Sequence, residues 1–323
     1  MPDQTLPLDI FAAQNVVSLP KPRGGEDDHF AAVAEWLQSI PLEKTIGACL
    51  RQAIDEVLDG QRTGRFDVDD LEKTEKTYLG TKVEIIIRSA LGLKKGPRMD
   101  YLIQGREVDS KFTIGKYWTI PREADGHICL LTSADDHDSV FRVGIVRINN
   151  SILNLGENRD GKRTLSAAGR QAVRWLVPEG KLPTNILMGL PEQDRVAIFA
   201  ASDGYRGHGN GGQLRTNELF RRVQRKAVDR NTVLTVARQD DSPKRVRDAR
   251  KKLRLEGIII LGHQSSHPRI ARDLHLTVPE KGSWIAAKVT KVTSSCDRPK
   301  TEIDGELYAI AVTGETAEAP GTY

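Results

Sequence analysis

The stretch MDYLIQGREVDSK, residues 99–111, predicts two β-strands joined by a turn at Gln104-Gly105. Short apolar runs on either side of a glycine-containing turn are typical of a hairpin. We expect its strands over residues 99–103 and 107–114. The sequence at this point therefore changes from helical patterns to a sheet.

The same hairpin carries three charged side chains that we expect to lie close together. Side chains alternate between the two faces of a strand, so Asp109 and Lys111 point the same way. Asp100 and Asp109 are nine residues apart across the turn, a spacing that brings them together on adjacent strands. Glu84, on the helix that precedes the hairpin, is a fourth candidate.

The segments that flank the hairpin predict a layered structure of helices and a sheet. Apolar residues recur at helical spacing before it, and short β-branched runs follow it. We expect helices at about 28–37, 42–59, 67–91 and 164–176, and further strands at 128–132 and 140–148. Helices, then a sheet, then a helix indicate an α/β or α+β fold.

Length and composition exclude several classes of protein. The 323 residues suggest two domains, since one domain usually takes roughly 100–200 residues. No apolar run approaches the ~18–20 residues of a membrane span. Acidic Asp3 and Asp9 stand where a signal peptide would carry basic residues. The three cysteines are far apart, which argues against disulfides. These features predict a cytoplasmic protein.

Positive charge is concentrated in the second half of the chain. Residues 213–275 contain sixteen Lys and Arg against seven Asp and Glu, a net of +9 where the whole chain has +4. Such a segment is the footprint of a phosphate-backbone partner. Ser242 and Pro243 signal the start of a helix that is basic except for a narrow apolar stripe. We expect it to bind DNA through Lys244, Arg245, Arg247, Arg250, Lys251, Lys252 and Arg254.

Two carboxylates on one face repel each other unless a cation neutralises them. Mg²⁺ suits such a site because it prefers a few carboxylate oxygens together with water. A lysine beside the metal can orient or deprotonate the attacking water and offset charge on the phosphorane. An acidic residue followed by Asp-x-Lys is therefore suited to hydrolysing a phosphodiester. The pattern alone is weak, but its place between a helix and a sheet, ahead of a basic domain, strengthens it.

The chain resembles a known family in stretches that lead up to this motif. Residues 59–65 (DGQRTGR), residues 70–77 (DLEKTEKT) and Asp109-Ser110-Lys111 are similar to the catalytic domain of the NaeI restriction endonucleases. The likeness covers most of the chain. It implies a restriction-endonuclease-like core whose active-site and metal-binding carboxylates fall on Glu84, Asp100 and Asp109, with Lys111 as the catalytic amine.

The resemblance also implies how such an enzyme works. Members act as homodimers on a GC-rich palindrome such as GCCGGC, with Mg²⁺ as cofactor. They belong to type IIE, in which a second DNA site bound at the C-terminal domain activates cleavage. We therefore expect double-stranded DNA, with two sites per dimer, as the partner, and no membrane.

These observations together predict an α/β protein, with a mixed-sheet core and flanking helices followed by a winged helix-turn-helix domain. The expected parts are a flexible arm (1–27), a catalytic endonuclease domain (28–177), a linker (178–184), a DNA-binding effector domain (185–314) and a disordered tail (315–323). Two other functions stay open at this point. One is a non-catalytic winged-helix regulator, and the other is a nicking or mismatch-repair-type nuclease with the same core.

Overall fold

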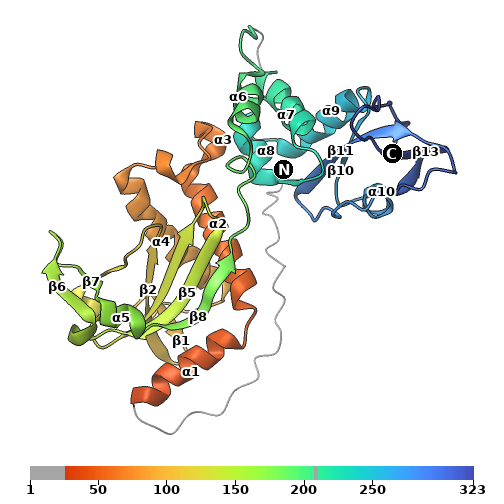
Figure 1. Cartoon of the computed structure of the whole chain (residues 1–323). Coiled ribbons are helices and arrows are strands. Elements are labelled where there is room, and N and C mark those ends of the chain that lie inside the picture. Colours follow the sequence, from red (N-terminus) through yellow and green to blue (C-terminus); the bar gives the residue numbers. More distant parts are fainter. Residues whose placement is uncertain (1–25, 207–209) are drawn as a thin grey trace, which may run out of the picture.

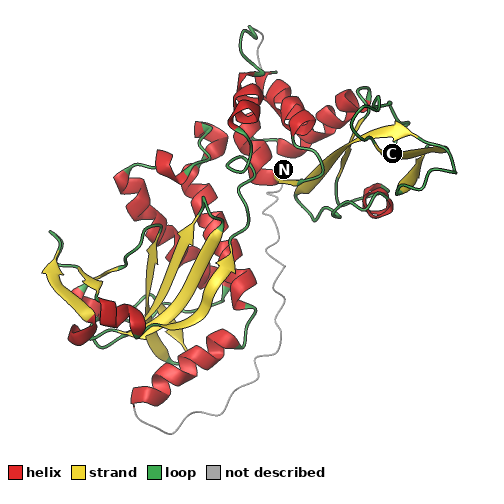
Figure 2. Cartoon of the chain, viewed as in Figure 1, coloured by secondary structure: helices red, strands yellow, loops and turns green. Residues whose placement is uncertain are grey.

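The structure is a computed structural model that describes residues 26–206 and 210–323, arranged as two successive regions (Figure 1). The expected flexible arm, residues 1–27, lies outside the described residues except for its last two, which begin helix α1. No helix in the described ranges is long and apolar enough to cross a membrane. Figure 2 shows that the first region combines helices with a broad sheet and that the second begins with helices.

Helices cover one face of the sheet in the first region, as their apolar periodicity predicts. The helices of this region are α1 (Glu26–Gln38), α2 (Leu42–Leu58), α3 (Gly60–Thr63) and α4 (Lys73–Ala90), of which α3 packs against helix α8 (Arg230–Ala237) and not on the sheet. The helix expected from residue 67 is divided into the short 3₁₀ helix η1 (Val68–Asp70) and α4. A capping box formed by Glu72 and Glu75 begins α4 as a separate helix. Each of the two side chains accepts from the backbone N–H of the other residue.

The main sheet has the strand order β1-β2-β4-β5-β8. Its strands are β1 (Tyr101–Ile103), β2 (Arg106–Thr113), β4 (Ile128–Asp135), β5 (Val140–Arg147) and β8 (Arg174–Lys181). The predicted hairpin is confirmed, with Tyr101 opposite Val108. Strands β2 and β4 run parallel and the other pairs antiparallel, so the sheet is mixed. This mixed α/β architecture agrees with the predicted fold class.

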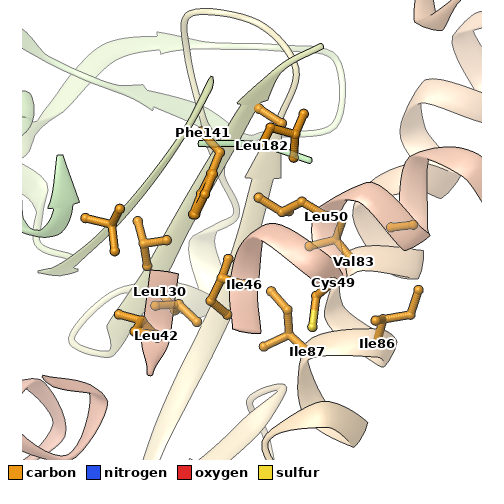
Figure 3. Close-up of a cluster of buried hydrophobic side chains, with 14 of the residues drawn as sticks. Leu42, Ile46, Cys49, Leu50, Val83, Ile86, Ile87, Leu130, Phe141 and Leu182 are labelled. Atoms are coloured by element: carbon orange, nitrogen blue, oxygen red, sulfur yellow. The ribbon is translucent and has the colours of Figure 1, made fainter. Parts of the chain in front are cut away.

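The largest apolar core lies between this sheet and helices α2 and α4. Figure 3 shows Ile46 and Leu50 of α2, Val83 and Ile87 of α4, and Leu130 of the sheet packed together. Burial of these side chains gives the strongest favourable contribution to folding. It also fixes which face of strands β2 and β4 is turned toward the helices.

A second, smaller sheet packs on the opposite face of the main sheet. It has the order β3-β7-β6, with β3 (Thr119–Ile120), β6 (Leu153–Glu157) and β7 (Arg163–Leu165), and it is flanked by the short helices η2 (Arg122–Ala124), η3 (Asn150–Ile152) and α5 (Ala167–Gln171). A separate apolar cluster fills the contact, and it includes Trp118, Ile120, Cys129, Leu131, Val146 and Leu165. The Trp118 Nε1–H also donates to the Thr132 carbonyl at 2.8 Å.

Strand β8 occupies residues for which the sequence predicted other structure. We expected a helix over residues 164–176 and a linker over 178–184, and both predictions are wrong where β8 runs. Only residues 167–171 are helical, behind Ser166, whose side chain accepts from the Gly169 N–H. Strand β8 pairs with the free edge of β5 and continues to Lys181. Pairing with a sheet edge satisfies a full row of backbone groups, which outweighs the weak local preference for a helix.

The second region combines several helices with a sheet of its own. The helices are α6 (Glu192–Ala200), α7 (Gly211–Arg222), α8 (Arg230–Ala237), α9 (Ser242–Arg254) and α10 (His267–Asp273). The strands are β9 (Ala227–Asp229), β10 (Ile258–Leu261), β11 (Ser283–Lys291), β12 (Lys300–Ile303) and β13 (Glu306–Ile310). Strand β11 lies between β10 and β13 and also pairs with β9. Helix α9 begins at Ser242, one residue earlier than the sequence predicts, because Asp241 rather than Ser242 is the N-cap.

Residues 315–323, which we expected to be disordered, pack against this second region. The Glu318 N–H donates to the Val289 carbonyl at 2.9 Å, and the Tyr323 hydroxyl accepts from the Ile260 N–H at 2.8 Å. Arg254 of α9 donates to the Pro320 carbonyl at 2.8 Å. The small and polar residues of this segment give no periodic signal, and its order depends on contacts that are remote in sequence.

A buried charge network ties α2 to the rest of the molecule. The Arg51 guanidinium pairs with Asp55 at 2.6 Å and also with Asp136 of the β4–β5 turn. The Asn231 amide of α8 donates to Asp55 at 2.9 Å. Since the Asp136 side chain is only 1% exposed, it has almost no water to replace a lost partner.

We expect Arg51→Met to lower the free energy of unfolding by about 3–5 kcal/mol, because it leaves buried carboxylates without a counter-charge. Urea denaturation at neutral pH measures this loss. The matched control is Arg62→Met, since Arg62 pairs with Asp59 at 3.0 Å but is 75% exposed. That change should stay within about 0.5 kcal/mol. Equal effects of the two substitutions would contradict the stabilising role of the network.

Candidate active site

Strand β2 and the residue before β1 bring Asp100, Asp109 and Lys111 together. The Lys111 Nζ lies 2.7 Å from Asp109 Oδ2 and 2.8 Å from Oδ1. The Asp100 Oδ2 accepts from the Ser110 N–H at 2.8 Å, which holds this carboxylate against the strand that carries the other two side chains. The hairpin thus forms a compact group of two carboxylates and one ammonium.

The group lies on the sheet face turned away from helices α2 and α4. Asp109 is the register partner of Cys129, and the Cys129 thiol lies 3.4 Å from Asp109 Oδ2. Cys129 belongs to the cluster under the small sheet, whereas Val108, one residue before Asp109, belongs to the helix-covered core. The alternation of side chains along β2 therefore places Asp109 and Lys111 beside the small sheet.

Burial and a neighbouring like charge perturb the Asp100 carboxylate. Burial raises the pKa of Asp100 above its usual value, and the neighbouring Asp109 carboxylate raises it further. The Ser110 N–H and the Lys111 ammonium act in the opposite direction. Burial, followed by the charge of Asp109, likewise raises the pKa of the Cys129 thiol. A partly buried pair of like charges of this kind is typical of a functional site.

Glu84 does not join Asp100 and Asp109 in one group of ligands. Its carboxylate pairs at 2.7 Å with Arg88, one turn further along α4. Arg88 also donates to the Asp100 backbone carbonyl at 3.4 Å, so Glu84 is linked to the site through this arginine. The physical reason is that α4 covers the sheet face opposite to the one that Asp109 occupies.

A different set of potential metal ligands lies on the surface. Within the described residues, the one group of three whose ligand atoms all lie within 4.8 Å of one another is Asp67, Asp69 and His137. The His137 Nε2 is 3.5 Å from Asp67 and 3.3 Å from Asp69, as in an ordinary exposed ion pair. This group of three lies at the start of η1 and in the β4–β5 turn. It includes none of the predicted site residues.

Sequence reasoning missed several residues that hold the site in place. Arg88 stands four residues after Glu84, a helical spacing that signals an ion pair and was available in the sequence. The Tyr101 hydroxyl contacts the Glu84 carbonyl at 3.1 Å and the Ser110 Oγ at 2.9 Å. Neither this contact nor that of Cys129 has a local sequence signal, because each joins different strands or helices.

Comparison with known proteins identifies the family of this chain. The model of the family described as restriction endonuclease NaeI matches residues 32–319. The chain belongs to the NaeI restriction endonuclease family. It is 42% identical over 313 residues to a type II restriction enzyme NaeI of Lentzea aerocolonigenes, a match that covers 94% of this chain and 98% of the relative.

This member of the NaeI family carries its basic helix, α9, with one face open to solvent. The structure divides the seven cations that the sequence predicts into two sets. Lys244, Arg247, Lys251 and Lys252 are exposed, whereas Arg245, Arg250 and Arg254 are partly buried. The apolar stripe of Val246, Ala249 and Leu253 packs inward, as predicted.

Two of the partly buried arginines are used inside the protein. The Arg250 Nε donates to the Ile260 carbonyl at 2.7 Å, and Arg254 donates to the Pro320 carbonyl. Burial lowers the pKa of Arg250. These side chains hold α9 against β10 and the C-terminal segment, so the exposed set forms the more accessible surface for a phosphate backbone.

Proposed function

We propose that this protein is a Mg²⁺-dependent, site-specific endonuclease that cuts both strands of DNA. The observation that carries the proposal is the group formed by Asp100, Asp109 and Lys111 on one hairpin. Family membership supports the same reaction class. Two adjacent carboxylates beside an amine are suited to metal-dependent hydrolysis, a reaction that a non-catalytic regulator does not perform.

The donor set fits a hard divalent cation. Asp100 and Asp109 offer carboxylate oxygens, which Mg²⁺ prefers, and the raised pKa of Asp100 reflects a charge that a cation would relieve. We assign the metal contacts to these two residues, with Glu84 acting through water. A bound Mg²⁺ would supply Lewis acidity and a more acidic water.

Lys111 is the proposed catalytic amine. Its Nζ donates to Asp109 and, at 3.0 Å, to the Ser110 carbonyl, so strand β2 fixes its position. From there the ammonium can orient the attacking water and offset negative charge that develops on the phosphate. Asp109 holds the amine in place through their salt bridge, while the Ser110 N–H holds the Asp100 carboxylate.

The second region is the proposed DNA-binding effector domain, with a winged helix-turn-helix fold. Its order α7-β9-α8-α9-β10-β11, with β11 pairing to both β9 and β10, supports this fold. Helix α9 would enter the major groove, where Arg247 can contact guanine edges and Lys251 and Lys252 can contact phosphates. We place the catalytic domain in residues 28–181 and this domain in the residues that follow β8.

A homodimer follows from cutting both strands, because a palindrome presents two symmetric scissile phosphates. We propose a GC-rich palindrome similar to GCCGGC as the substrate. Type IIE activation, in which the C-terminal domain binds a second DNA site, is part of the same proposal.

Digestion of a plasmid of known sequence tests the proposed function. With Mg²⁺ we expect discrete fragments whose mapped ends share one palindrome, and with EDTA we expect none. Added oligonucleotides that contain the site should speed cleavage if the second site activates the enzyme. Nicked circles as the final product would instead favour the nicking nuclease. An absence of any hydrolysis with Mg²⁺ or Mn²⁺ would reject the proposal.

A further inference from the structure

The hairpin formed by β6 and β7 projects away from the main sheet (Figure 1). Strand β6 pairs with β7 on one side and is an edge strand on the other. Its Leu155 is 94% exposed, and residues 154–160 are all exposed. A projecting edge of this kind requires an explanation, because exposed strands otherwise promote unwanted pairing.

The base of the hairpin lies on the sheet face that carries the candidate active site. Leu165 of β7 packs in the same apolar cluster as Cys129, whose thiol contacts Asp109. Residues 114–118 run directly from the end of β2 into β3, which pairs with β7. A duplex that presents a phosphate to Lys111 would therefore pass beside this small sheet.

Two cations of the hairpin have no partner among the residues that the structure describes. Arg163 is held by the Asn154 carbonyl at 2.6 Å and by Asn150 at 2.8 Å, and Glu157 pairs with Arg122. By contrast, the side chains of Arg159 and Lys162 make no hydrogen bond or ion pair with the described residues. Arg159 is exposed at the turn, and Lys162 is partly exposed at the start of the returning strand.

Hydrogen bonds within the turn hold its backbone in place. The Asn158 Oδ1 accepts from the N–H groups of Asp160 at 3.0 Å and Lys162 at 2.9 Å, and Gly161 adopts the left-handed conformation that closes the loop. A pre-ordered loop loses little conformational entropy when it binds. The backbone positions from which Arg159 and Lys162 extend are therefore fixed by the turn.

We infer that the β6–β7 hairpin is a DNA-contacting arm of the catalytic half, with Arg159 directed to a base edge and Lys162 to a phosphate. A two-stranded ribbon fits the major groove, and arginine pairs with guanine in two hydrogen bonds. The assignment rests on the proposed function, since it requires a duplex at the Asp109–Lys111 site. It adds a sequence-reading element that is separate from helix α9.

Single-turnover cleavage of short duplexes tests Arg159. The substrates are the mapped site and the same duplex with single base-pair changes. Arg159→Gln should slow cleavage of the intact site by about tenfold or more, because one base contact is lost. The effect should be smaller on the duplex whose changed base pair is the one that Arg159 contacts. The control Lys44→Gln removes an exposed lysine from α2, on the other side of the sheet, and should leave both rates unchanged.

Equilibrium binding to duplex DNA without metal tests Lys162 independently of cleavage. Lys162→Gln should reduce the slope of log affinity against log salt by about 0.9, as expected for one phosphate contact. Both variants should melt as the wild type does, since neither side chain has a partner to lose. The DNA-contacting role of the hairpin would be rejected if both variants kept the wild-type cleavage rates, preference for the intact site and salt slope. It would also be rejected if the variants changed the oligomeric state instead. If the wild-type protein bound DNA but did not cut it, the proposed function would be rejected. The salt slope of Lys162→Gln would still show whether the hairpin contacts DNA.

Discussion

Lys111→Ala should reduce the rate of DNA cleavage on the order of 10³-fold or more, while the affinity for DNA stays the same. The amine lies 2.7 Å from Asp109 and is the one cation of the hairpin group. Its loss removes the side chain that orients the attacking water and offsets charge in the transition state. The cleavage rate at saturating Mg²⁺ and the Kd for uncut DNA are the two measurements.

The matched control for this prediction is Lys44→Ala. Lys44 is an exposed lysine on α2, the helix that covers the other face of the sheet. The two proteins should melt at similar temperatures, so that a difference in rate reports on chemistry. Full cleavage activity in Lys111→Ala would reject the proposed active site.

Replacing Lys244, Lys251 and Lys252 with Gln together should weaken DNA binding strongly and flatten its salt dependence. Each lost phosphate contact lowers the slope of log affinity against log salt by about 0.9, so three contacts lower it by roughly 2.7. These side chains lie on the exposed face of α9. Binding titrations between low and moderate salt measure both effects.

Arg250→Gln is the matched comparison on the same helix. Because Arg250 donates to the Ile260 carbonyl, its loss should lower the stability of the second region more than it changes the salt slope. Conversely, the triple variant should keep the melting temperature of the wild type. If the triple variant kept the wild-type salt slope, α9 would not be the main phosphate-binding surface.

The sequence by itself determined the features that depend on neighbouring residues. The turn at Gln104-Gly105 and the apolar runs around it specify the hairpin, and a period of two places Asp109 and Lys111 on one face. The same holds for the start of α9, to within one residue of Pro243, and for its inward stripe. Such patterns need no knowledge of distant partners, because the geometry of a single strand or helix fixes them.

Only the tertiary structure decided features that depend on long-range pairing. Strand β8 formed because β5 offered a free edge, and residues 315–323 became ordered because β10 and α9 offered hydrogen-bond partners. The same contacts turned Arg250 and Arg254 inward. Packing of α4 on one sheet face, with Asp109 on the other, kept Glu84 apart from the pair that it was expected to join. Burial and backbone satisfaction across the whole fold set these outcomes, and no local pattern records them.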